Sequence, residues 1–145
     1  MITISEEEIE QFLVRVDKSF PVPISQKQEL HLYAKKLHDK ATLCVKTQGS
    51  RILAMVAGYT EDIVDDRAYI ALVATLEETQ GKGFASELVK EFIGVCRKKK
   101  IAAVHLYASA VNAPAMTMYS RLGFHKWEQN NEPRPEDIHF IYYID

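Results

Sequence analysis

The sequence lacks the features that mark several classes of protein. It has only two cysteines, Cys44 and Cys96, which lie far apart in apolar segments. This arrangement argues against a disulfide framework or a cysteine metal site and predicts two buried thiols. No run approaches the roughly 18 apolar residues of a membrane span, and the stretch from Met1 to Ser5 lacks a signal-peptide pattern. We therefore expect a cytoplasmic protein that makes no membrane contact.

The sequence also lacks a large excess of charge of either sign. The formal net charge is −2, so electrostatics give no reason to expect a nucleic-acid partner. His31 and His38 are seven residues apart, too far to share one metal ion, and we expect no metal. The apolar fraction of 47% and the length of 145 residues predict one globular domain over residues 1–145, as a monomer or a homodimer, with a core that needs no disulfide or metal.

The most informative stretch runs from Tyr69 to Lys99 and reads as a strand, a glycine turn and a helix. Its strand is the apolar run from Tyr69 to Leu76, and its turn contains Gly81 and Gly83. Apolar residues then recur at helical spacing, at Leu88, Val89, Phe92, Ile93 and Cys96. The first-turn amides of a helix lack internal partners and favour an anion, and glycine allows a phosphate to approach the backbone.

Two nucleotide-binding interpretations of this turn can be tested by spacing. A nucleotide P-loop requires Ser or Thr after its lysine, whereas Lys82 is followed by Gly83. A dinucleotide fingerprint requires a third glycine where Ser86 stands, and an acidic residue after the next strand, which ends in Ser109. Neither pattern fits. A plain connection that merely favours glycine stays open on this segment alone.

The rest of the chain predicts further helices and strands. Capping boxes at Ser5 and Ser25 predict two helices, one ending before Pro21 and the other near Asp39. Gly58 lies inside a predicted strand, where it indicates a bulge or a close backbone approach. Any strand before the first helix is limited to residues 1–4. The remaining elements are a hairpin over residues 41–47 and 51–60, strands near 102–108, 124–128 and 139–144, and a short helix over 114–122 with Pro114 as its first residue.

This order predicts an α/β sandwich: a mixed, mostly antiparallel sheet flanked by about four helices. A second pattern stands in its C-terminal part, with Asn112 before the short helix, Ala115 and Tyr119 on one face of that helix, and Gly123 at its end. Read on its own, the pattern is satisfied by an N-cap, a packed aromatic ring and a C-cap.

The two patterns together resemble the GNAT family, the GCN5-related N-acetyltransferases. The turn Gln80-Gly-Lys-Gly83-Phe-Ala85 is similar to the family's Gln/Arg-x-x-Gly-x-Gly/Ala motif for acetyl-CoA. The run from Asn112 to Phe124 is similar to its Asn-x-x-Ala-x-x-x-Tyr-x-x-x-Gly-Phe signature. The resemblance covers nearly the whole chain and implies the GNAT fold. It also implies direct transfer of an acetyl group from acetyl-CoA to a primary amine.

The resemblance also implies roles for particular residues. Backbone groups of Val73, Ala74 and Thr75 would contact pantetheine through a bulge, and strand amides there would stabilise the oxyanion. Asn112 would contact pantetheine, and Tyr119 would protonate the departing thiolate. The pyrophosphate would be bound by the turn that contains Gln80, Gly81, Lys82, Gly83, Phe84, Ala85 and Ser86. The basic run from Arg97 to Lys100 is typical of a solvated helix end but could assist the nucleotide phosphates.

The general base and the acceptor stay open. Relatives with a glutamate base carry it where this chain has Tyr107. His105 is a candidate base because an imidazole titrates near neutral pH, although a structural histidine fits equally well. A water chain to Glu61 or Asp62 is a third option.

Residues that could line the acceptor site are Tyr33, Trp127, Arg134 and Glu136. The compact chain, which is not acidic enough to favour basic peptides, favours a small amine metabolite or an amino sugar. The alternatives are a protein N-terminal or lysine acetyltransferase, and a non-catalytic acyl-CoA-binding module.

Overall fold

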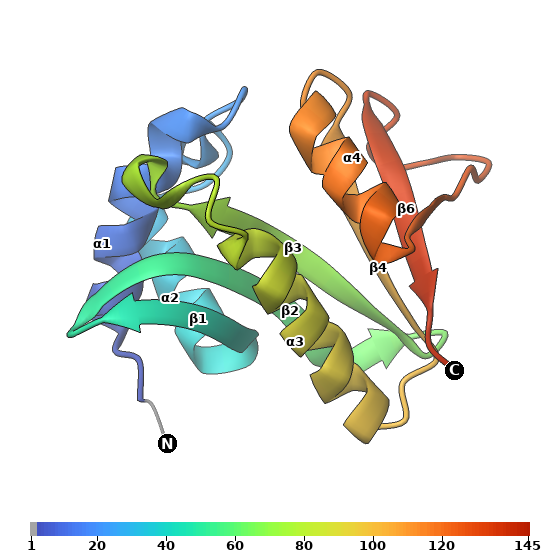
Figure 1. Ribbon diagram of the computed structural model, residues 1–145, viewed down its shortest axis with the longest axis horizontal. Coiled ribbons are helices and arrows are strands. Elements are labelled where there is room, and N and C mark those ends of the chain that lie inside the picture. The colour runs from blue at the N-terminus through green and yellow to red at the C-terminus, as the bar shows by residue number, and fades with distance from the viewer. Residues whose placement is uncertain (1–2) are drawn as a thin grey trace.

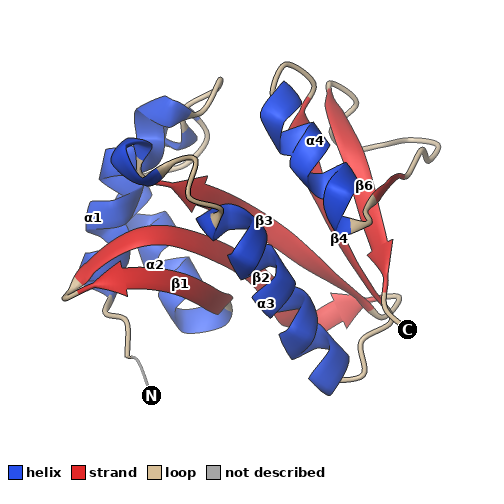
Figure 2. Cartoon of the chain, in the orientation of Figure 1, coloured by secondary structure: helices blue, strands red, loops and turns tan. Residues whose placement is uncertain are grey.

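The computed structural model describes residues 3–145. Within this range the chain forms four α-helices and one six-stranded sheet (Figures 1 and 2). The strands lie in the order β1-β2-β3-β4-β6-β5. The elements in chain order are α1 (Glu6–Val16), α2 (Leu30–Lys40), β1 (Thr42–Gln48), β2 (Arg51–Val64), β3 (Arg67–Thr75), α3 (Phe84–Lys98), β4 (Ala103–Ser109), α4 (Ala113–Leu122), β5 (His125–Lys126) and β6 (Asp137–Tyr143). The predicted mixed, mostly antiparallel α/β architecture is confirmed.

The first helix begins where the sequence predicts. The Ser5 hydroxyl accepts from the Glu8 amide, and the Glu8 carboxylate accepts from the Ser5 amide, which completes the capping box. A strand before this helix was limited to residues 1–4. Residues 1–2 lie outside the described part of the chain, and Thr3 and Ile4 are not in a strand.

The second helix has its N-cap at Glu29, four residues after the predicted cap at Ser25. The Ser25 amide and hydroxyl both donate to the Asp17 carboxylate, at 2.9 and 2.6 Å, so this serine is not available as a cap. The side chain of Glu29 takes over and accepts from the amides of His31 and Leu32, at 2.8 and 3.1 Å. The prediction at Ser25 is wrong because a tertiary hydrogen bond competes with the local one.

The predicted strands differ from the observed ones mainly at their ends. β2 continues to Val64 instead of ending at Thr60. The predicted strand over residues 124–128 is reduced to His125 and Lys126, because residues 127–136 leave the sheet as a loop. Pro114 is the second residue of α4 rather than the first.

Two hydrophobic cores lie on opposite faces of the sheet. α1 and α2 cover one face of β2 and β3, with Phe12 and Leu37 fully buried there. α3 and α4 cover the other face, and the core beneath them extends from β1 to β6. The predicted stripe of α3 is wholly buried in this second core: Leu88, Val89, Phe92, Ile93 and Cys96.

Candidate active site

The sheet opens in its middle, between β3 and β4 (Figure 1). These strands form the only parallel pair among the described strands, and they pair through only three residues each, from Arg67 opposite Ala103 to Tyr69 opposite His105. Beyond Tyr69 and His105 the two strands diverge. The C-terminal half of β3, which includes Val73, Ala74 and Thr75, therefore has no partner on its β4 side.

A β-bulge lies beside this opening. Ala57 pairs with Leu72 and Gly58 pairs with Ile70, so Ala71 is the extra residue on β3. The bulge reverses which side chains face each core, since Ile70 packs beneath α3 whereas Leu72 packs beneath α1 and α2. The irregularity predicted at Gly58 is confirmed.

The glycine turn joins β3 to α3 at the edge of the opening. Gly81 and Gly83 adopt φ values of 84° and 79°, in the left-handed region that favours glycine. Nothing lies within 4 Å of where a Cβ would stand on either residue, so the space in front of the backbone is free. Gly83 is the N-cap of α3 and supplies no side-chain acceptor to the first-turn amides. We call Gly81, Gly83 and the first-turn amides of α3 the glycine cradle, which therefore fits an anion such as a pyrophosphate.

The other residues of the turn lie around this cradle. Gln80, Gly81 and Lys82 are exposed, whereas Phe84, Ala85 and Ser86 form the half-buried first turn of α3. The Gln80 side-chain amide donates to the Thr75 carbonyl at 3.5 Å and so ties the turn to the end of β3.

The second pattern forms α4. The Asn112 side-chain oxygen accepts from the Ala115 amide at 3.2 Å, which confirms Asn112 as an N-cap and leaves its NH₂ group free to donate. Tyr119 is buried beneath α4, with its ring centroid 5.7 Å from those of Phe124 and Phe140. Burial raises the pKa of Tyr119, so the phenol keeps its proton at neutral pH.

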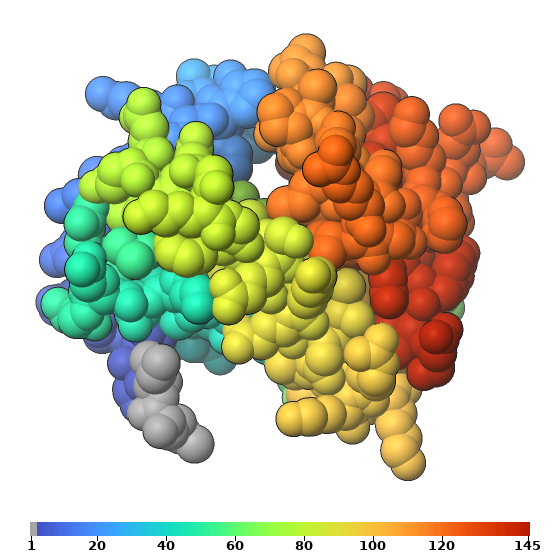
Figure 3. Space-filling view, viewed as in Figure 1, coloured from blue at the N-terminus to red at the C-terminus, as the bar shows by residue number. Residues whose placement is uncertain are grey.

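An open groove of about 900 Å³ separates α3 from α4. Figure 3 shows this face, with the α3 segment in yellow and the α4 segment in orange. Three basic side chains line the groove, those of Lys90, Arg97 and Arg121. Arg97 belongs to the basic run at the end of α3, so one member of that run reaches a concave surface.

His105 lies on the face of β4 that points away from the core beneath α3 and α4. There it belongs to a network of polar and aromatic side chains. Its Nδ1 is 2.8 Å from Nε2 of His139, and Nδ1 of His139 is 2.8 Å from Oε2 of Glu132. The Tyr107 hydroxyl donates to Oε1 of Glu132 at 3.0 Å, and its ring stacks on His139 at 4.2 Å. We call His105, His139, Glu132 and Tyr107 the histidine network.

The prediction that His105 titrates near neutral pH is wrong. Burial, together with the nearby His139 and the Arg67 guanidinium, lowers the pKa of His105 to about 4. The expectation of titration near neutral pH assumed a solvated imidazole, whereas His105 is half-buried beside other donors and a cation. At neutral pH the ring is therefore uncharged and carries a hydrogen on one of its two nitrogens.

Several residues predicted to line an acceptor site lie near the histidine network. Trp127 packs edge-on against His105, and the Arg67 guanidinium lies 4.8 Å from the Trp127 ring centroid. Arg134 donates to the Tyr69 hydroxyl at 3.3 Å and lies over the Tyr107 ring. Tyr33 on α2 is buried, and burial raises the pKa of its phenol. Glu136 is exposed.

The two acids considered as remote bases lie elsewhere. Glu61 forms an ion pair with Lys99 at the end of α3 and is largely exposed. Asp62 is exposed beside it with φ at 53°. No hydrogen bond found in the described part of the chain joins either acid to the histidine network.

Sequence reasoning missed His139 and Glu132. His139 alternates along β6 so that it faces away from the core containing Phe140, a pattern that indicates the face of the sheet but not the partner, since β4 places Tyr107 opposite it. Glu132 carries no such signal, because it lies in the irregular loop between β5 and β6.

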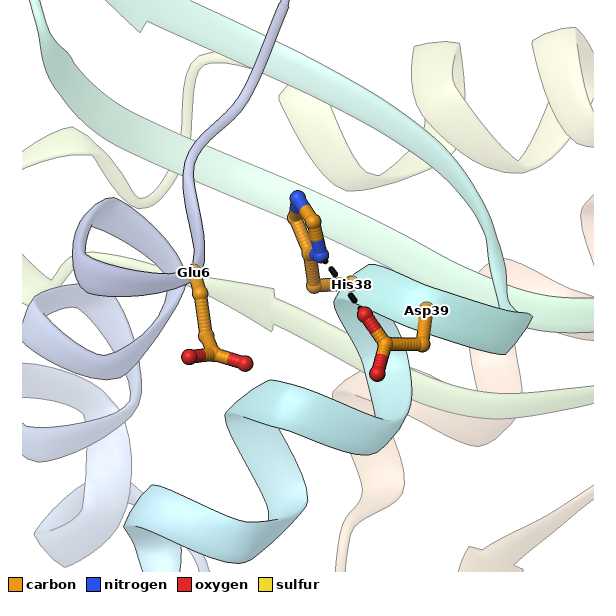
Figure 4. Close-up of side chains that lie close together, drawn as sticks. All are labelled: Glu6, His38 and Asp39. Atoms are coloured by element: carbon orange, nitrogen blue, oxygen red, sulfur yellow. Dashed lines mark hydrogen bonds and ion pairs between the residues drawn. The ribbon is translucent and has the colours of Figure 1, made fainter.

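A separate cluster combines Glu6, His38 and Asp39 at the surface (Figure 4). Their ligand atoms lie within 4.8 Å of one another, a spacing that could hold a metal ion. His38 hydrogen-bonds to Asp39 at 2.9 Å, and the same carboxylate pairs with Lys35 at 3.2 Å. The lysine already supplies a positive charge to this exposed cluster.

None of the helices in the part of the chain that the structure describes is long and apolar enough to cross a membrane.

Known proteins match both the sequence and the fold. The model of the acetyltransferase (GNAT) family matches residues 4–124. A 59-residue segment is 37% identical to mycothiol acetyltransferase of Arthrobacter sp. (strain FB24), and covers 41% of this chain and 18% of that protein. A 63-residue segment is 32% identical to N-alpha-acetyltransferase 30 of Schizosaccharomyces pombe, and covers 43% and 42%. The matched segments thus span less than half of each relative's length.

Solved structures share the fold at low identity. The PaiA N-acetyltransferase of Thermoplasma acidophilum, solved in complex with coenzyme A, superposes with a TM-score of 0.76 over 99% of this chain and 97% of that one, at 14% identity. With an opened mixed sheet, a glycine turn and both sequence motifs in place, the family match settles the class. The chain belongs to the GNAT acetyltransferase family.

Proposed function

We propose that the protein is an acetyl-CoA-dependent N-acetyltransferase that transfers an acetyl group directly to a primary amine. The observation that carries the proposal is the divergence of β3 and β4 directly beside the open glycine cradle of α3. An extended ligand with a phosphorylated end matches this pairing of an unpaired strand edge with free helix amides.

The proposed acetyl-CoA site uses residues from both patterns. The amides of Phe84, Ala85 and Ser86 would hold the pyrophosphate, with Gly81 and Gly83 clearing the approach and Gln80 and Lys82 beside it. Backbone groups of Val73, Ala74 and Thr75, with the free NH₂ of Asn112, would hold the pantetheine amides. The basic side chains of the groove between α3 and α4 would face the nucleotide phosphates.

The proposed acetyl transfer uses a base on one face of the sheet, His105, and an acid on the other, Tyr119. Acetyl-CoA supplies an activated acyl group as a thioester. A neutral amine attacks the carbonyl carbon, and amides near the bulge at Ala71 would stabilise the oxyanion. His105 would take a proton from the amine nitrogen, and Tyr119 would give a proton to the sulfur as the C–S bond breaks. Cys44 and Cys96 are buried, and burial raises their pKa to about 12 and about 11, which supports direct transfer without an acyl-enzyme.

The acceptor that we favour is a small amine metabolite or an amino sugar. A second candidate is the N-terminal amine of a protein, since N-alpha-acetyltransferase 30 of Schizosaccharomyces pombe is among the relatives. A lysine side chain belongs to the same chemical class. A non-catalytic acyl-CoA-binding module is disfavoured because the buried Tyr119 and the histidine network flank the opening on both faces.

The test is thiol release from acetyl-CoA with a panel of amines. The panel would hold small amines, amino sugars, peptides with free N-termini, and N-terminally blocked peptides with one lysine. Turnover with any amine supports the enzyme, and the preferred amine identifies the acceptor class. Tight acetyl-CoA binding by calorimetry without turnover of any amine would show the non-catalytic module instead.

A further inference from the structure

We propose that Glu132 and His139 are positioning residues for acetyl transfer, which fix the tautomer of His105 and relay a proton to Glu132 as His105 takes one from the acceptor. The inference rests on the proposed function, in which His105 acts as the base. It concerns two residues that neither sequence pattern contains.

The hydrogen bonds are all donated in one direction, from His105 through His139 to Glu132. Desolvation raises the pKa of Glu132, but hydrogen bonds from His139 and Tyr107 outweigh it and lower that pKa. The carboxylate therefore stays ionised and can only accept hydrogen bonds. Nδ1 of His139, 2.8 Å away, must therefore carry a hydrogen. In a neutral imidazole the other nitrogen is then an acceptor, so Nε2 of His139 accepts from Nδ1–H of His105 at 2.8 Å. Nε2 of His105 is left with its lone pair.

The position of His105 suits a base. It is opposite Tyr69 in the last pair before β3 and β4 diverge, so it stands at the closed end of the opening. The Tyr69 and Trp127 rings lie against it, with centroids 5.1 and 6.1 Å away. The ring is thereby held on the face opposite Tyr119, and Nε2 is the nitrogen outside the chain of hydrogen bonds.

His105 would be a poor base without this chain. A positive charge on its ring is opposed by burial, by His139 and by the Arg67 guanidinium. A relay avoids that charge. The titratable and charged groups around His105 are Arg67 and Tyr69 of β3, Tyr107 of its own strand, His139 of β6, and Glu132 and Arg134 of the loop.

Each proton in the relay moves by one hydrogen bond. Nε2 of His105 takes a proton from the amine nitrogen as the N–C bond forms. Nδ1 of His105 gives its proton to Nε2 of His139, and Nδ1 of His139 gives its proton to Oε2 of Glu132. Both rings end neutral in the opposite tautomer, and Glu132 ends protonated. When the product has left, water can take the proton from Nε2 of His105, and the other protons return along the same hydrogen bonds, which leaves Glu132 ionised again.

The first test compares Glu132→Gln with Glu128→Gln over a range of pH. Glutamine keeps an oxygen that accepts from His139 but cannot take up the proton. Glu128 is an exposed acid near the start of the same loop, so its variant removes the same charge outside the network. We expect Glu132→Gln to lower kcat/KM by about 10²-fold, at the lower end of acid–base effects. Glu128→Gln should retain the wild-type value.

The pH profile separates a relay from a structural role. A proton on the chain blocks the base, and the Glu132 carboxylate favours that proton by its negative charge. Removing the negative charge in Glu132→Gln should therefore shift the acidic limb of the kcat/KM profile to lower pH. Unchanged kcat/KM, or a loss of rate with the limb unmoved, would overturn the proposal.

A second measurement needs no substrate. Nitrogen-15 chemical shifts of the imidazole rings at pH 7.5 distinguish the tautomers, with assignment by a His105→Asn variant. We expect protonated Nδ1 and unprotonated Nε2 on both His105 and His139. A proton on Nε2 of His105 would overturn the inference even in an active enzyme. If the wild type turns over no amine, the proposed function fails, and the inference fails with it even if the rings show the expected tautomers.

Discussion

Two glycines should respond in opposite directions to the same substitution. A Cβ on Gly58 would lie 2.5 Å from Cζ of Phe92 and 2.6 Å from the Tyr69 carbonyl oxygen. Phe92 is fully buried and the Tyr69 oxygen is backbone at the β3–β4 junction, so neither can move cheaply. Overpacking of this kind costs about 1–3 kcal/mol. Gly94 lies within α3 with nothing within 4 Å, and alanine there should stabilise by about 0.5–1 kcal/mol.

The assay is equilibrium unfolding in urea, with the midpoint and slope fitted for the wild type, Gly58→Ala and Gly94→Ala. We expect a lower midpoint for Gly58→Ala and a higher one for Gly94→Ala, with similar slopes. Gly94→Ala is the control for the general gain from replacing glycine. If Gly58→Ala were as stable as the wild type, the close approach of α3 to the bulge would be refuted.

Four further outcomes are expected. Gly83→Val should weaken coenzyme A binding in calorimetry, because it places a side chain in the cradle; unchanged affinity in a folded variant would contradict the site. Tyr119→Phe should lower the acetyl-transfer rate by roughly 10²–10⁴-fold with little change in acetyl-CoA affinity; weaker binding at an unchanged maximal rate would make Tyr119 a packing residue. Cys44 and Cys96 should resist a thiol reagent at pH 8 and form no acetyl adduct by mass spectrometry, since burial raises their pKa. Because the pKa of His105 is lowered from 6.5 to about 4, the unfolded state binds more protons between these values, and stability should fall as the pH drops from 6.5 to 4; a His105→Gln variant with the same slope would argue against this.

Local signals in the sequence were enough to predict most of the fold. The capping box at Ser5 and the apolar stripe of α3 depend on neighbouring residues, and both appear as expected. The start of α2 could not be predicted in this way. It depends on Asp17, which binds Ser25 from eight residues away and leaves the cap to Glu29.

The two halves of the candidate site differ in the same respect. The glycine cradle and the cap at Asn112 are contiguous motifs, so the sequence could indicate them. His139 on β6 lies 34 residues after His105 in the sequence, and Glu132 in an irregular loop lies 27 residues after it. No periodicity connects Glu132 to His105, and the low pKa of His105 depends on burial that only the folded chain creates.

The short pairing of β3 with β4 has a consequence for how the family's opening can be adjusted. Three residue pairs fix where the two strands meet, and among the described residues their pairing does not continue beyond Tyr69 and His105. The core beneath α3 and α4 packs against both halves of the sheet, so we expect its side-chain volume to influence the distance between the diverging ends of β3 and β4. Adding or removing a methyl group in this core should therefore widen or narrow the cleft. A substitution remote from every reacting atom can change which molecules fit.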